Sequence, residues 1–410
     1  MTTAHRQGGR GGRLDGPHAI AVYEELTDGL TRPLRLAEVA YRAAERHPGR
    51  LPSRAEIAAE RTCLQKDKAG LEIAQGDFIA HLLADPPCGD HLIAAMSEPL
   101  PEALAALETF KRDGGLDLGP MRVDRNGPVG IVTNQNHACL NAEDDASTRA
   151  MEIAVDLVLL DDTIEVGVLR GGPAIHPKHA GRRIFGAGIN LTHLYTGKIS
   201  LIEFMLDREL GAITKMYRGH GVASDLPAEA DAGAREKPWV AVVESFAIGG
   251  ACQWLLVMDR VVAQRGSYFN LPARKEGIIP GCANLRLPRL VGERAARQAI
   301  MFGRAFQAEA ADGRLIADEV VADDEIDAAL ERAAEELLSA GTTALVANRR
   351  ALRLAQEPLT AFRRYMSLYA SEQARCLYSP ALIANLERNW QAAQRAGTMR
   401  YTAPAASSET

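Results

Sequence analysis

The feature that most constrains the fold is an alternation of short apolar runs and helical patterns in the middle of the chain. The runs PVGIVTNQ, IEVGVLRGG, PWVAVVESFAIGG and RVVAQRG are rich in Val and Ile and have the length of strands. Helix-period segments such as AEDDASTRAMEIAVDLVLLDD and LIEFMLDRELGAITKMYRG lie between them. This alternation predicts a largely parallel sheet with helices on its faces. Because most of the runs are continuously apolar, we expect strands that are buried on both sides.

Helical patterns precede and follow this α/β region. We therefore place the domain boundaries where the sequence pattern changes. LRLAEVAYRAAERH and RAEIAAERTCLQKD precede the region, and DEIDAALERAAEELLSA follows it. We predict a disordered tail at 1–16, an N-terminal helical domain at 17–120, an α/β core at 121–295, a C-terminal helical region at 296–400 and a frayed tail at 401–410. The chemistry is expected in the core.

Composition excludes several classes of protein. The 410 residues are 47% hydrophobic and 24% charged, which is typical of a soluble globular chain. A net charge of -6 gives no basic field for nucleic acid, and no apolar stretch is long enough to span a membrane. The six scattered cysteines form no C-x-x-C pair, which argues against a zinc site or disulfide framework. We therefore expect a cytoplasmic protein with reduced thiols.

Two glycine-bearing turns join strand patterns to helical segments. They are RRIFGAGINLTHL, residues 182–194, and FAIGGACQW, residues 246–254. Small residues at such a turn leave free backbone N–H groups at the start of the next helix, where an anion or a developing oxyanion can bind. Tight packing of helix against strand explains either turn equally well when it is considered alone.

Together with GIVTNQNHACLNAED and IIPGCANLRLPRLVG, and in this order, the two turns make the chain resemble the crotonase (enoyl-CoA hydratase/isomerase) superfamily. The resemblance covers residues 129–290 and continues more weakly through the C-terminal helices. It implies a crotonase-like ββα spiral core and a coenzyme A thioester as substrate. It also implies that the backbone N–H groups of Ile189 and Gly250 form an oxyanion hole. A homo-oligomer, trimer or dimer of trimers, is expected, with contacts through the helices from Pro358.

The two glutamates that handle water and protons in the hydratases are missing. Gln253 and Ala273 stand at the matching positions, and neither side chain titrates near neutral pH. Glu276 lies three residues beyond the second position, and we expect it to face elsewhere. No base for an α proton is therefore evident in the sequence.

A long N-terminal helical region combined with these changes resembles one branch of the superfamily, the cofactor-independent dioxygenases of glycopeptide antibiotic biosynthesis. The resemblance implies conversion of 3,5-dihydroxyphenylacetyl-CoA and O2 to 3,5-dihydroxyphenylglyoxylate and free CoA, without metal or organic cofactor. A crotonase-type hydrolase or decarboxylase remains an alternative, as does a non-catalytic CoA-binding protein. A Cys252 nucleophile is less favoured than a buried small residue.

The resemblance assigns roles to three polar side chains, and each has a plainer alternative. Arg208 is expected in the pocket as a cation for an anionic oxygen, although a surface ion pair with a neighbouring acid would also explain it. Glu143 is expected to accept from a ring hydroxyl, although a carboxylate near a helix start is common. Gln253 suits a second hydroxyl because its amide donates and accepts without removing a proton, although an ordinary residue near a helix start would also explain it.

Further residues are expected to bind CoA or oxygen. A phosphate-rich ligand needs a local basic patch even on an acidic protein. The CoA and substrate candidates are His137, His176, Lys178, His179, Arg182, Arg183, Ala187, Gly188, Asn190 and Leu191. An apolar wall for O2 is assigned to Ile278, Ile279 and Pro280, because a dry site favours an apolar gas. His176 and His179 have metal-like spacing, but the surrounding cations and the lack of a third ligand argue against a metal site.

Overall fold

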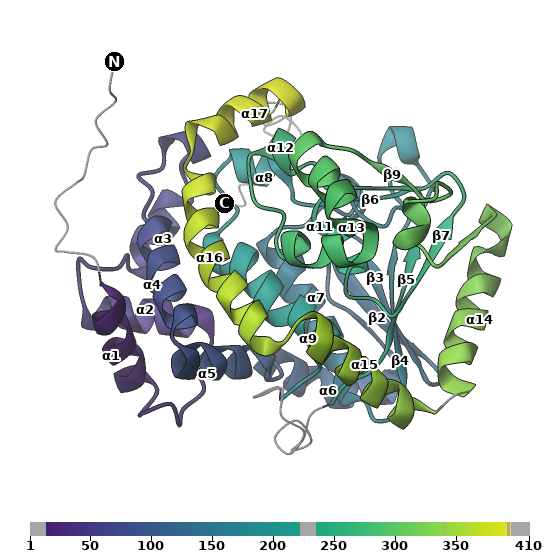
Figure 1. Ribbon diagram of the computed structural model, residues 1–410, viewed down its shortest axis with the longest axis horizontal. Helices are drawn as coiled ribbons and strands as arrows, with labels where there is room; N and C mark the ends of the chain where they lie inside the picture. The colour runs from purple at the N-terminus through teal and green to yellow at the C-terminus, as the bar shows by residue number, and fades with distance from the viewer. Residues whose placement is uncertain (1–13, 222–234, 340, 392–393, 395–410) are drawn as a thin grey trace, which may run out of the picture.

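The computed structural model of the protein describes residues 14–221, 235–339, 341–391 and 394, and it contains two β-sheets among many helices (Figure 1). The larger sheet has the order β1-β2-β3-β4-β5-β7-β10. Its strands are β1 (Gly115–Asp117), β2 (Met121–Asn126), β3 (Val129–Asn134), β4 (Val166–Gly171), β5 (Trp239–Val243), β7 (Arg260–Gln264) and β10 (Glu319–Val321). Neighbours from β3 to β10 pair in parallel, whereas β1 and β2 are antiparallel additions. The predicted parallel sheet is confirmed.

The central strands are buried on both faces, as their continuous apolar runs predict. Every residue of β4 and β5 is buried. Helix α7 (Asp145–Leu160) shares one hydrophobic cluster with one face of the sheet. Helix α14 (Ile326–Ser339) covers the other face, where its apolar side packs on valines of β4, β5 and β7. The sheet is therefore a rigid layer between helices.

The predicted strand PWVAVVESFAIGG is two strands in two sheets. After β5, Ser245 adopts a positive φ of 66°, and the chain continues as β6 (Phe246–Ile248). Strand β6 pairs with β8 (Tyr268–Asn270), which pairs with β9 (Phe306–Gln307). The bend carries the double glycine away from the large sheet. Helix α11 (Gly250–Leu255) begins at the second of these glycines.

The segment that contains Arg208 is helical, as predicted, but with wide π-type turns. It consists of η4 (Leu201–Leu206), η5 (Arg208–Ile213) and α9 (Thr214–Arg218). The Thr214 hydroxyl donates to the Glu209 carbonyl oxygen at 2.6 Å, five residues earlier in this segment. Such π segments are rare and frequently occur at functional sites.

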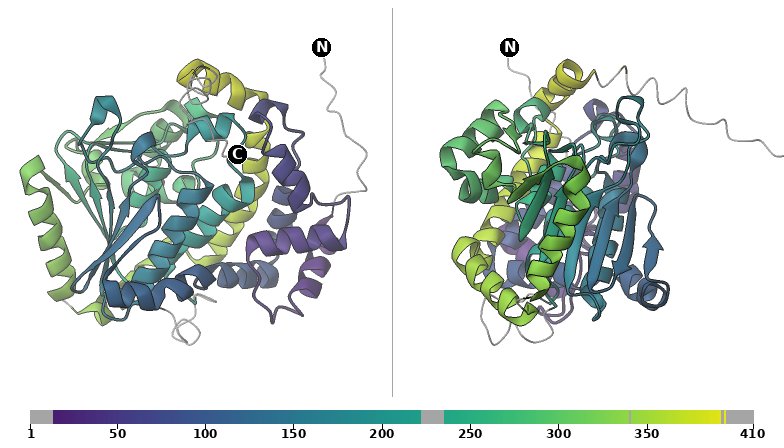
Figure 2. Two further views of the ribbon diagram at one scale, coloured as in Figure 1. Left: turned by 180° about the vertical axis from the view of Figure 1, so that it is seen from behind. Right: turned by 90° about the vertical axis from the view of Figure 1, so that its right-hand side faces the viewer.

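Helices from both ends of the chain pack together on one side of the molecule (Figure 2). The N-terminal helices are α1 (Gly16–Leu26), α2 (Leu36–Arg46), α3 (Arg54–Glu60), α4 (Glu72–Ala84), α5 (Pro86–Ser97) and α6 (Pro101–Asp113). The later ones are α8 (Leu191–Tyr195), α12 (Ala273–Glu276), α13 (Ala283–Phe302), α15 (Thr342–Gln356), α16 (Leu359–Leu377) and α17 (Pro380–Trp390). A Cβ on Gly76 of α4 would lie 2.6 Å from the Ala374 Cβ of α16, so this glycine permits close helix packing.

Residues 1–13 of the predicted N-terminal tail and the whole of 401–410 lie outside the described residues. The chain is already ordered at Asp15, whose side chain caps α1 by accepting from the His18 amide. Gly16, the last residue of the predicted tail, is the first residue of α1.

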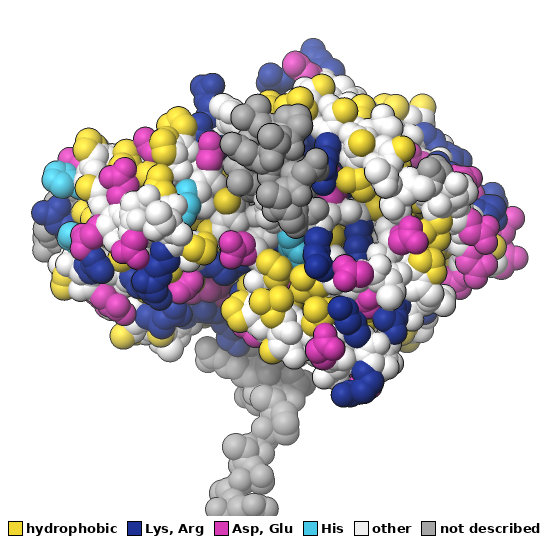
Figure 3. All heavy atoms as spheres, turned by 90° about the horizontal axis from the view of Figure 1, so that it is seen from below, with side chains coloured by type: hydrophobic (Ala, Val, Ile, Leu, Met, Phe, Trp, Pro, Cys, Tyr) yellow, Lys and Arg dark blue, Asp and Glu magenta, His cyan; other side chains and the backbone are white. Residues whose placement is uncertain are grey.

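The surface carries charge unevenly. On the face shown in Figure 3, acidic side chains gather over one end of the molecule, and lysines and arginines are spread between apolar patches. The exposed acids of α14 and the turn before it are Asp323, Asp324, Glu325, Asp327, Glu331, Glu335 and Glu336. Within the described part of the chain, every helix falls short of the length and apolarity that a bilayer crossing requires.

Candidate active site

A small cavity lies where helix α16 meets the α/β core. Its wall consists of Glu143, Ile189, Phe204, Met205, Arg208, Glu209, Gly250, Gln253, Glu276, Ile278, Ile279, Pro280, Gly281 and Tyr369. The structure thus brings together the five predicted catalytic residues and the three predicted oxygen-pocket residues. The cavity holds about 30 Å³, whereas a benzene ring occupies a cavity on the order of 150 Å³. An aromatic ligand would therefore have to displace lining side chains such as the methionine.

The two glycine turns touch each other in this cavity wall. Gly186 and Ala247 form a parallel bridge, and the Ile248 amide donates to the Gly186 oxygen at 3.0 Å. A Cβ on Gly188 would lie 3.0 Å from the Gly250 nitrogen. The absence of a side chain at Gly188, whose φ is 76°, therefore lets the turns approach.

The amides of Ile189 and Gly250 are both available for a ligand. Around Ile189, the Glu143 amide donates to the Gly188 oxygen and the Asn190 amide donates to the Glu143 oxygen, each at 2.7 Å. Gly250 is the first residue of α11, where amides have no intrahelical acceptor. Among the hydrogen bonds of the described residues, neither amide has an acceptor. Both adjoining turns therefore present a backbone donor without an acceptor among the described residues.

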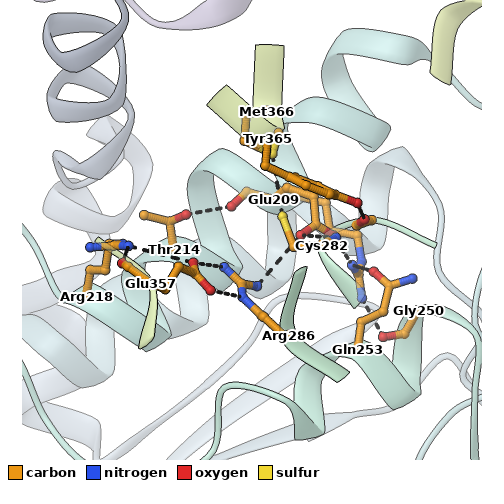
Figure 4. A network of polar contacts seen from close by, with 12 residues as sticks. Glu209, Thr214, Arg218, Gly250, Gln253, Cys282, Arg286, Glu357, Tyr365 and Met366 are labelled. Carbon is orange, nitrogen blue, oxygen red and sulfur yellow. Dashed lines mark hydrogen bonds and ion pairs between the residues drawn. The ribbon is translucent and has the colours of Figure 1, made fainter. Parts of the chain in front are cut away.

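Arg208 connects the polar side of the pocket. Its Nε donates to Glu143 Oε2 at 2.8 Å, and its Nη1 donates at 2.8 Å to both Glu209 Oε1 and Gln253 Oε1. Its Nη2 donates to the Gly250 carbonyl oxygen at 2.6 Å. The Gly250–Gln253 end of this network is drawn in Figure 4. The guanidinium is thus engaged by protein groups and fixes their positions, rather than pointing free into the cavity.

These contacts orient Gln253. Because a guanidinium only donates, the atom of Gln253 that faces Arg208 must be the amide oxygen. The NH2 group of the amide is then left to donate to another acceptor. Gln253 therefore offers a donor, rather than a titrating acid, at the position where the hydratases carry a glutamate.

Glu143 is held from two sides and explains the glycine at position 250. It precedes Asp144, the N-cap of α7, and it accepts from Trp254 Nε1 at 2.6 Å as well as from Arg208. A Cβ on Gly250 would lie only 2.2 Å from Glu143 Oε2. Glycine is therefore required here by a close side-chain approach as well as by the turn.

The expectation that Glu276 faces elsewhere is wrong. Residues 273–276 form the single turn of α12, and residues three apart in a helix lie on the same face. Glu276 is buried and lines the cavity, one turn beyond the Ala273 position of the missing glutamate. Burial raises the pKa of Glu276 to about 7. The i, i+3 relation was the sequence signal that could have identified this carboxylate.

Several other lining residues have no signal in the sequence. Tyr369 comes from α16, more than a hundred residues after α11, and Gly281 accepts a hydrogen bond from the Tyr365 hydroxyl. Glu209 accepts from the Cys282 amide at 3.2 Å and from Arg208. Contacts between distant segments create this part of the wall.

Cys252 is buried, as expected of a small core residue, and burial raises the pKa of its thiol to about 12. A thiol with this pKa is protonated near neutral pH and is a weak nucleophile.

The predicted CoA residues form a basic loop outside the cavity wall. Lys178, Arg182 and Arg183 are exposed, and His176 and His179 are half-buried. His137 lies beside the base of the loop, because a Cβ on Gly172 would be 2.9 Å from its ring. Across the described residues, His, Cys, Asp and Glu side chains nowhere gather in groups of three that could hold a metal ion.

The remaining candidates belong to the first glycine turn and have structural roles. Ala187 packs in a small apolar cluster with Phe246, and Gly188 allows the two turns to approach. Asn190 caps α8 by accepting from the His193 amide at 3.0 Å, and Leu191 is the first residue of that helix. These contacts hold the backbone that presents the Ile189 amide.

The chain is similar to known proteins of the enoyl-CoA hydratase/isomerase group. The family model described as "Enoyl-CoA hydratase/isomerase" matches residues 227–370. A (3,5-dihydroxyphenyl)acetyl-CoA 1,2-dioxygenase of Amycolatopsis orientalis is 47% identical over 369 residues, which are 90% of this chain and 83% of the relative. A probable enoyl-CoA hydratase of Rhizobium meliloti is 28% identical over 61% of this chain and 90% of its own length.

Solved structures show the same fold. An enoyl-CoA hydratase from Mycobacterium avium subsp. paratuberculosis matches with a TM-score of 0.54 and 22% identity, over 67% of this chain and 97% of that protein. An enoyl-CoA hydratase from Bacillus halodurans matches with a TM-score of 0.54 and 18% identity, over 66% of this chain and its own full length. The chain therefore belongs to the enoyl-CoA hydratase/isomerase (crotonase) superfamily and, within it, to the family of the Amycolatopsis dioxygenase.

Proposed function

We propose that the protein is a cofactor-independent dioxygenase that converts 3,5-dihydroxyphenylacetyl-CoA and O2 to 3,5-dihydroxyphenylglyoxylate and free CoA. The observation that carries this proposal is the 47% identity to the Amycolatopsis dioxygenase, which extends over 90% of the chain. The replacement of the hydratase glutamates by Gln253 and Ala273 supports it, because addition of water lacks its usual acid and base. A product of this kind suits the biosynthesis of antibiotics that contain dihydroxyphenylglycine.

The two adjoining turns provide the chemistry that activates the substrate. In our proposal the thioester oxygen accepts hydrogen bonds from the amides of Ile189 and Gly250, which stabilise the enolate formed when an α proton leaves. One such donor is worth about 3 kcal/mol in a transition state. The electron-rich carbon then reduces O2 and forms a peroxide. Attack of the peroxide on the thioester expels CoA, and cleavage of the O–O bond with loss of the second α proton leaves the glyoxylate.

The polar wall suits a ring with two hydroxyl groups. Glu143 would accept from one phenol O–H, and the NH2 group of Gln253 would donate to the other oxygen. Arg208 holds both side chains through bonds of 2.8 Å, so we assign it a positioning role rather than direct contact with the ring. Ile278, Ile279 and Pro280 supply an apolar wall on which O2 could lie.

The basic loop supports binding of CoA phosphates. Its three exposed cations, Lys178, Arg182 and Arg183, directly precede the first glycine turn, so a phosphate group held there would leave the thioester near Ile189. Asn190 and Leu191 would fix the turn. We further propose a cytoplasmic homo-oligomer built on trimers, in keeping with the superfamily.

The test is to measure O2 consumption and free-thiol release together, with protein that has been treated with a strong chelator. We expect one thiol for each O2, and both atoms of 18O2 in the glyoxylate product. Thiol release without O2 would indicate a hydrolase, and no release would indicate a binding protein. Activity that disappears on chelation and returns with iron would contradict the cofactor-independent reaction.

A further inference from the structure

One carboxylate of the pocket has no charged partner within the part of the chain that the structure describes. Glu143 and Glu209 are both hydrogen-bonded to Arg208. Glu276 lies in the same wall, but among the described residues it forms neither an ion pair nor a hydrogen bond through its carboxylate. A buried carboxylate without a partner lowers the stability of the folded protein. Such a group is therefore a candidate for a role in the reaction.

The backbone around Glu276 is fixed by neighbouring elements. The Gly277 amide donates to the Ala273 oxygen at 2.7 Å, and Asn389 of α17 donates to the Lys275 oxygen at 3.0 Å. Glu276 Oε1 lies 3.7 Å from the point where a Cβ on Gly249 would be, and Gly249 directly precedes the Gly250 amide. The carboxylate therefore adjoins the place that we assign to the thioester carbonyl.

We propose that Glu276 is the general base that removes the α proton, an inference that rests on the proposed function. The carboxylate takes the proton from the carbon next to the carbonyl, and the C–H electron pair moves into the enolate. The negative charge passes to the oxygen bound by Ile189 and Gly250. Glu276 then holds the proton as a carboxylic acid and gives it to the CoA thiolate when the thiolate leaves.

The surroundings of Glu276 suit this role. Burial raises its pKa to about 7, and a general base is most effective when its pKa lies near the working pH. The titratable groups that share its pocket are Glu143, Arg208, Glu209 and Tyr369. Arg208 is paired with both glutamates, and burial raises the pKa of Tyr369 well above its usual value, so the phenol stays neutral. Helix α17 contributes the neutral amides of Asn385 and Asn389.

The direct test is exchange of the α hydrogens of 3,5-dihydroxyphenylacetyl-CoA in D2O without oxygen, followed by mass spectrometry. We expect wild-type protein to exchange them, and Glu276→Gln to lose exchange and O2 turnover by at least roughly 100-fold. Glu276→Asp should recover part of the exchange. Binding of the thioester, measured by calorimetry, should change little in either variant. Exchange at the wild-type rate in Glu276→Gln would overturn the proposal.

Controls separate this inference from the function on which it rests. Glu293→Gln, at an exposed glutamate of α13, should keep wild-type exchange and turnover. The wild-type exchange rate should rise with pH through about 7 and then level off, because only ionised Glu276 acts as a base. A flat wild-type profile from pH 5.5 to 8.5 would reject Glu276 even if the variants fail to fold. Wild-type protein that neither exchanges nor consumes O2 would instead contradict the proposed function.

Discussion

Two buried glutamates in this protein have opposite surroundings. Glu357 is fully buried and accepts from Arg286 at 2.9 and 3.0 Å and from Arg289 at 2.9 Å. Burial alone would raise its pKa, but the arginines, Arg286 foremost, hold the pKa of Glu357 at about 2. Glu276 is buried without a cation, and its pKa is raised to about 7. Both carboxylates are buried, so the difference between their pKa values comes from the arginines beside Glu357.

The comparison separates a carboxylate that stabilises the fold from one that remains available for chemistry. Figure 4 shows Arg218 and Glu357 at one end of a buried network and Gln253 and Gly250 at the other, with Arg286 and Glu209 between them. Along this network each charge meets an opposite charge, up to the pocket wall. Glu276 lies in that wall outside the network. We infer that pairing fixes the scaffold and that the unpaired group carries reactivity.

The largest expected effect is on stability. Glu357→Gln leaves the buried Arg286 and the half-buried Arg289 without their carboxylate, so the free energy of unfolding should fall by about 3–5 kcal/mol. Urea unfolding at pH 7 measures it. Glu102→Gln, which breaks the exposed Arg149–Glu102 pair, is the matched control and should cost less than about 1 kcal/mol. Equal losses of unfolding free energy in the two variants would mean that the buried Glu357 contributes no more to stability than the exposed Glu102.

The pH dependence of this contribution follows from the depressed pKa. Since the pKa of Glu357 is lower in the folded state than its ordinary value of 4.5, its contribution is complete above pH 4.5. It is lost as the pH falls toward 2. Wild-type protein should therefore lose more stability than Glu357→Gln over this range.

The next effect is on catalysis. Gly250→Ala places a Cβ against Glu143 Oε2 and Arg208, so the turn must shift and its amide lose alignment. We expect kcat to fall by about 10²–10³, the usual result of losing one oxyanion donor. Gly16→Ala is a suitable control, because the added Cβ would meet only His81, at 3.6 Å. Wild-type turnover in Gly250→Ala would remove this amide from the mechanism.

The sequence predicted those parts of the fold that depend on local pattern. Continuous Val and Ile runs identified the buried strands β3, β4, β5 and β7, and helical periodicity identified α7, α14 and most terminal helices. It missed β1, β8, β9 and β10, which have two or three residues each, and the break at Ser245. It also missed the six-residue β2, whose sequence MRVDRN is mostly polar. Short edge strands and a single positive φ leave little periodic signal.

The site was predictable to the extent that it depends on family motifs. Ile189, Gly250 and Gln253, which the family motifs single out, line one cavity in the structure. The sequence did not show that Arg208 is saturated by protein acceptors, because these come from three separate segments. Glu276 lies three residues after Ala273, and this separation along the chain suggests a different direction for its side chain. Because residues 273–276 form one helical turn, the two side chains instead lie on the same face.

Stability should also reveal the cost of leaving Glu276 unpaired. Its pKa is raised from 4.5 to about 7 in the folded state, so its effect on folding is neutral below pH 4.5 and becomes unfavourable as the pH rises to 7. Glu276→Gln should therefore be more stable than wild type at pH 8, by up to roughly 3 kcal/mol, and equally stable at pH 4.5. Paired urea titrations at the two pH values measure this difference. A variant that is less stable at pH 8 would indicate a partner for the carboxylate.

The smallest effect concerns recognition of the ring. In Gln253→Leu the amide donor is lost, and so is the acceptor for Arg208 Nη1. Loss of the acceptor for Arg208 Nη1 affects every substrate equally. The kcat/KM for the dihydroxyphenyl thioester divided by the kcat/KM for the phenylacetyl thioester therefore reports only on the contact between the amide and the ring hydroxyl. A neutral hydrogen bond is worth about 0.5–1.5 kcal/mol, so this ratio should fall about three- to tenfold. An unchanged ratio would mean that the amide contacts no ring hydroxyl and only holds the Arg208 guanidinium. Gln253 would then have a structural role, as Glu357 has.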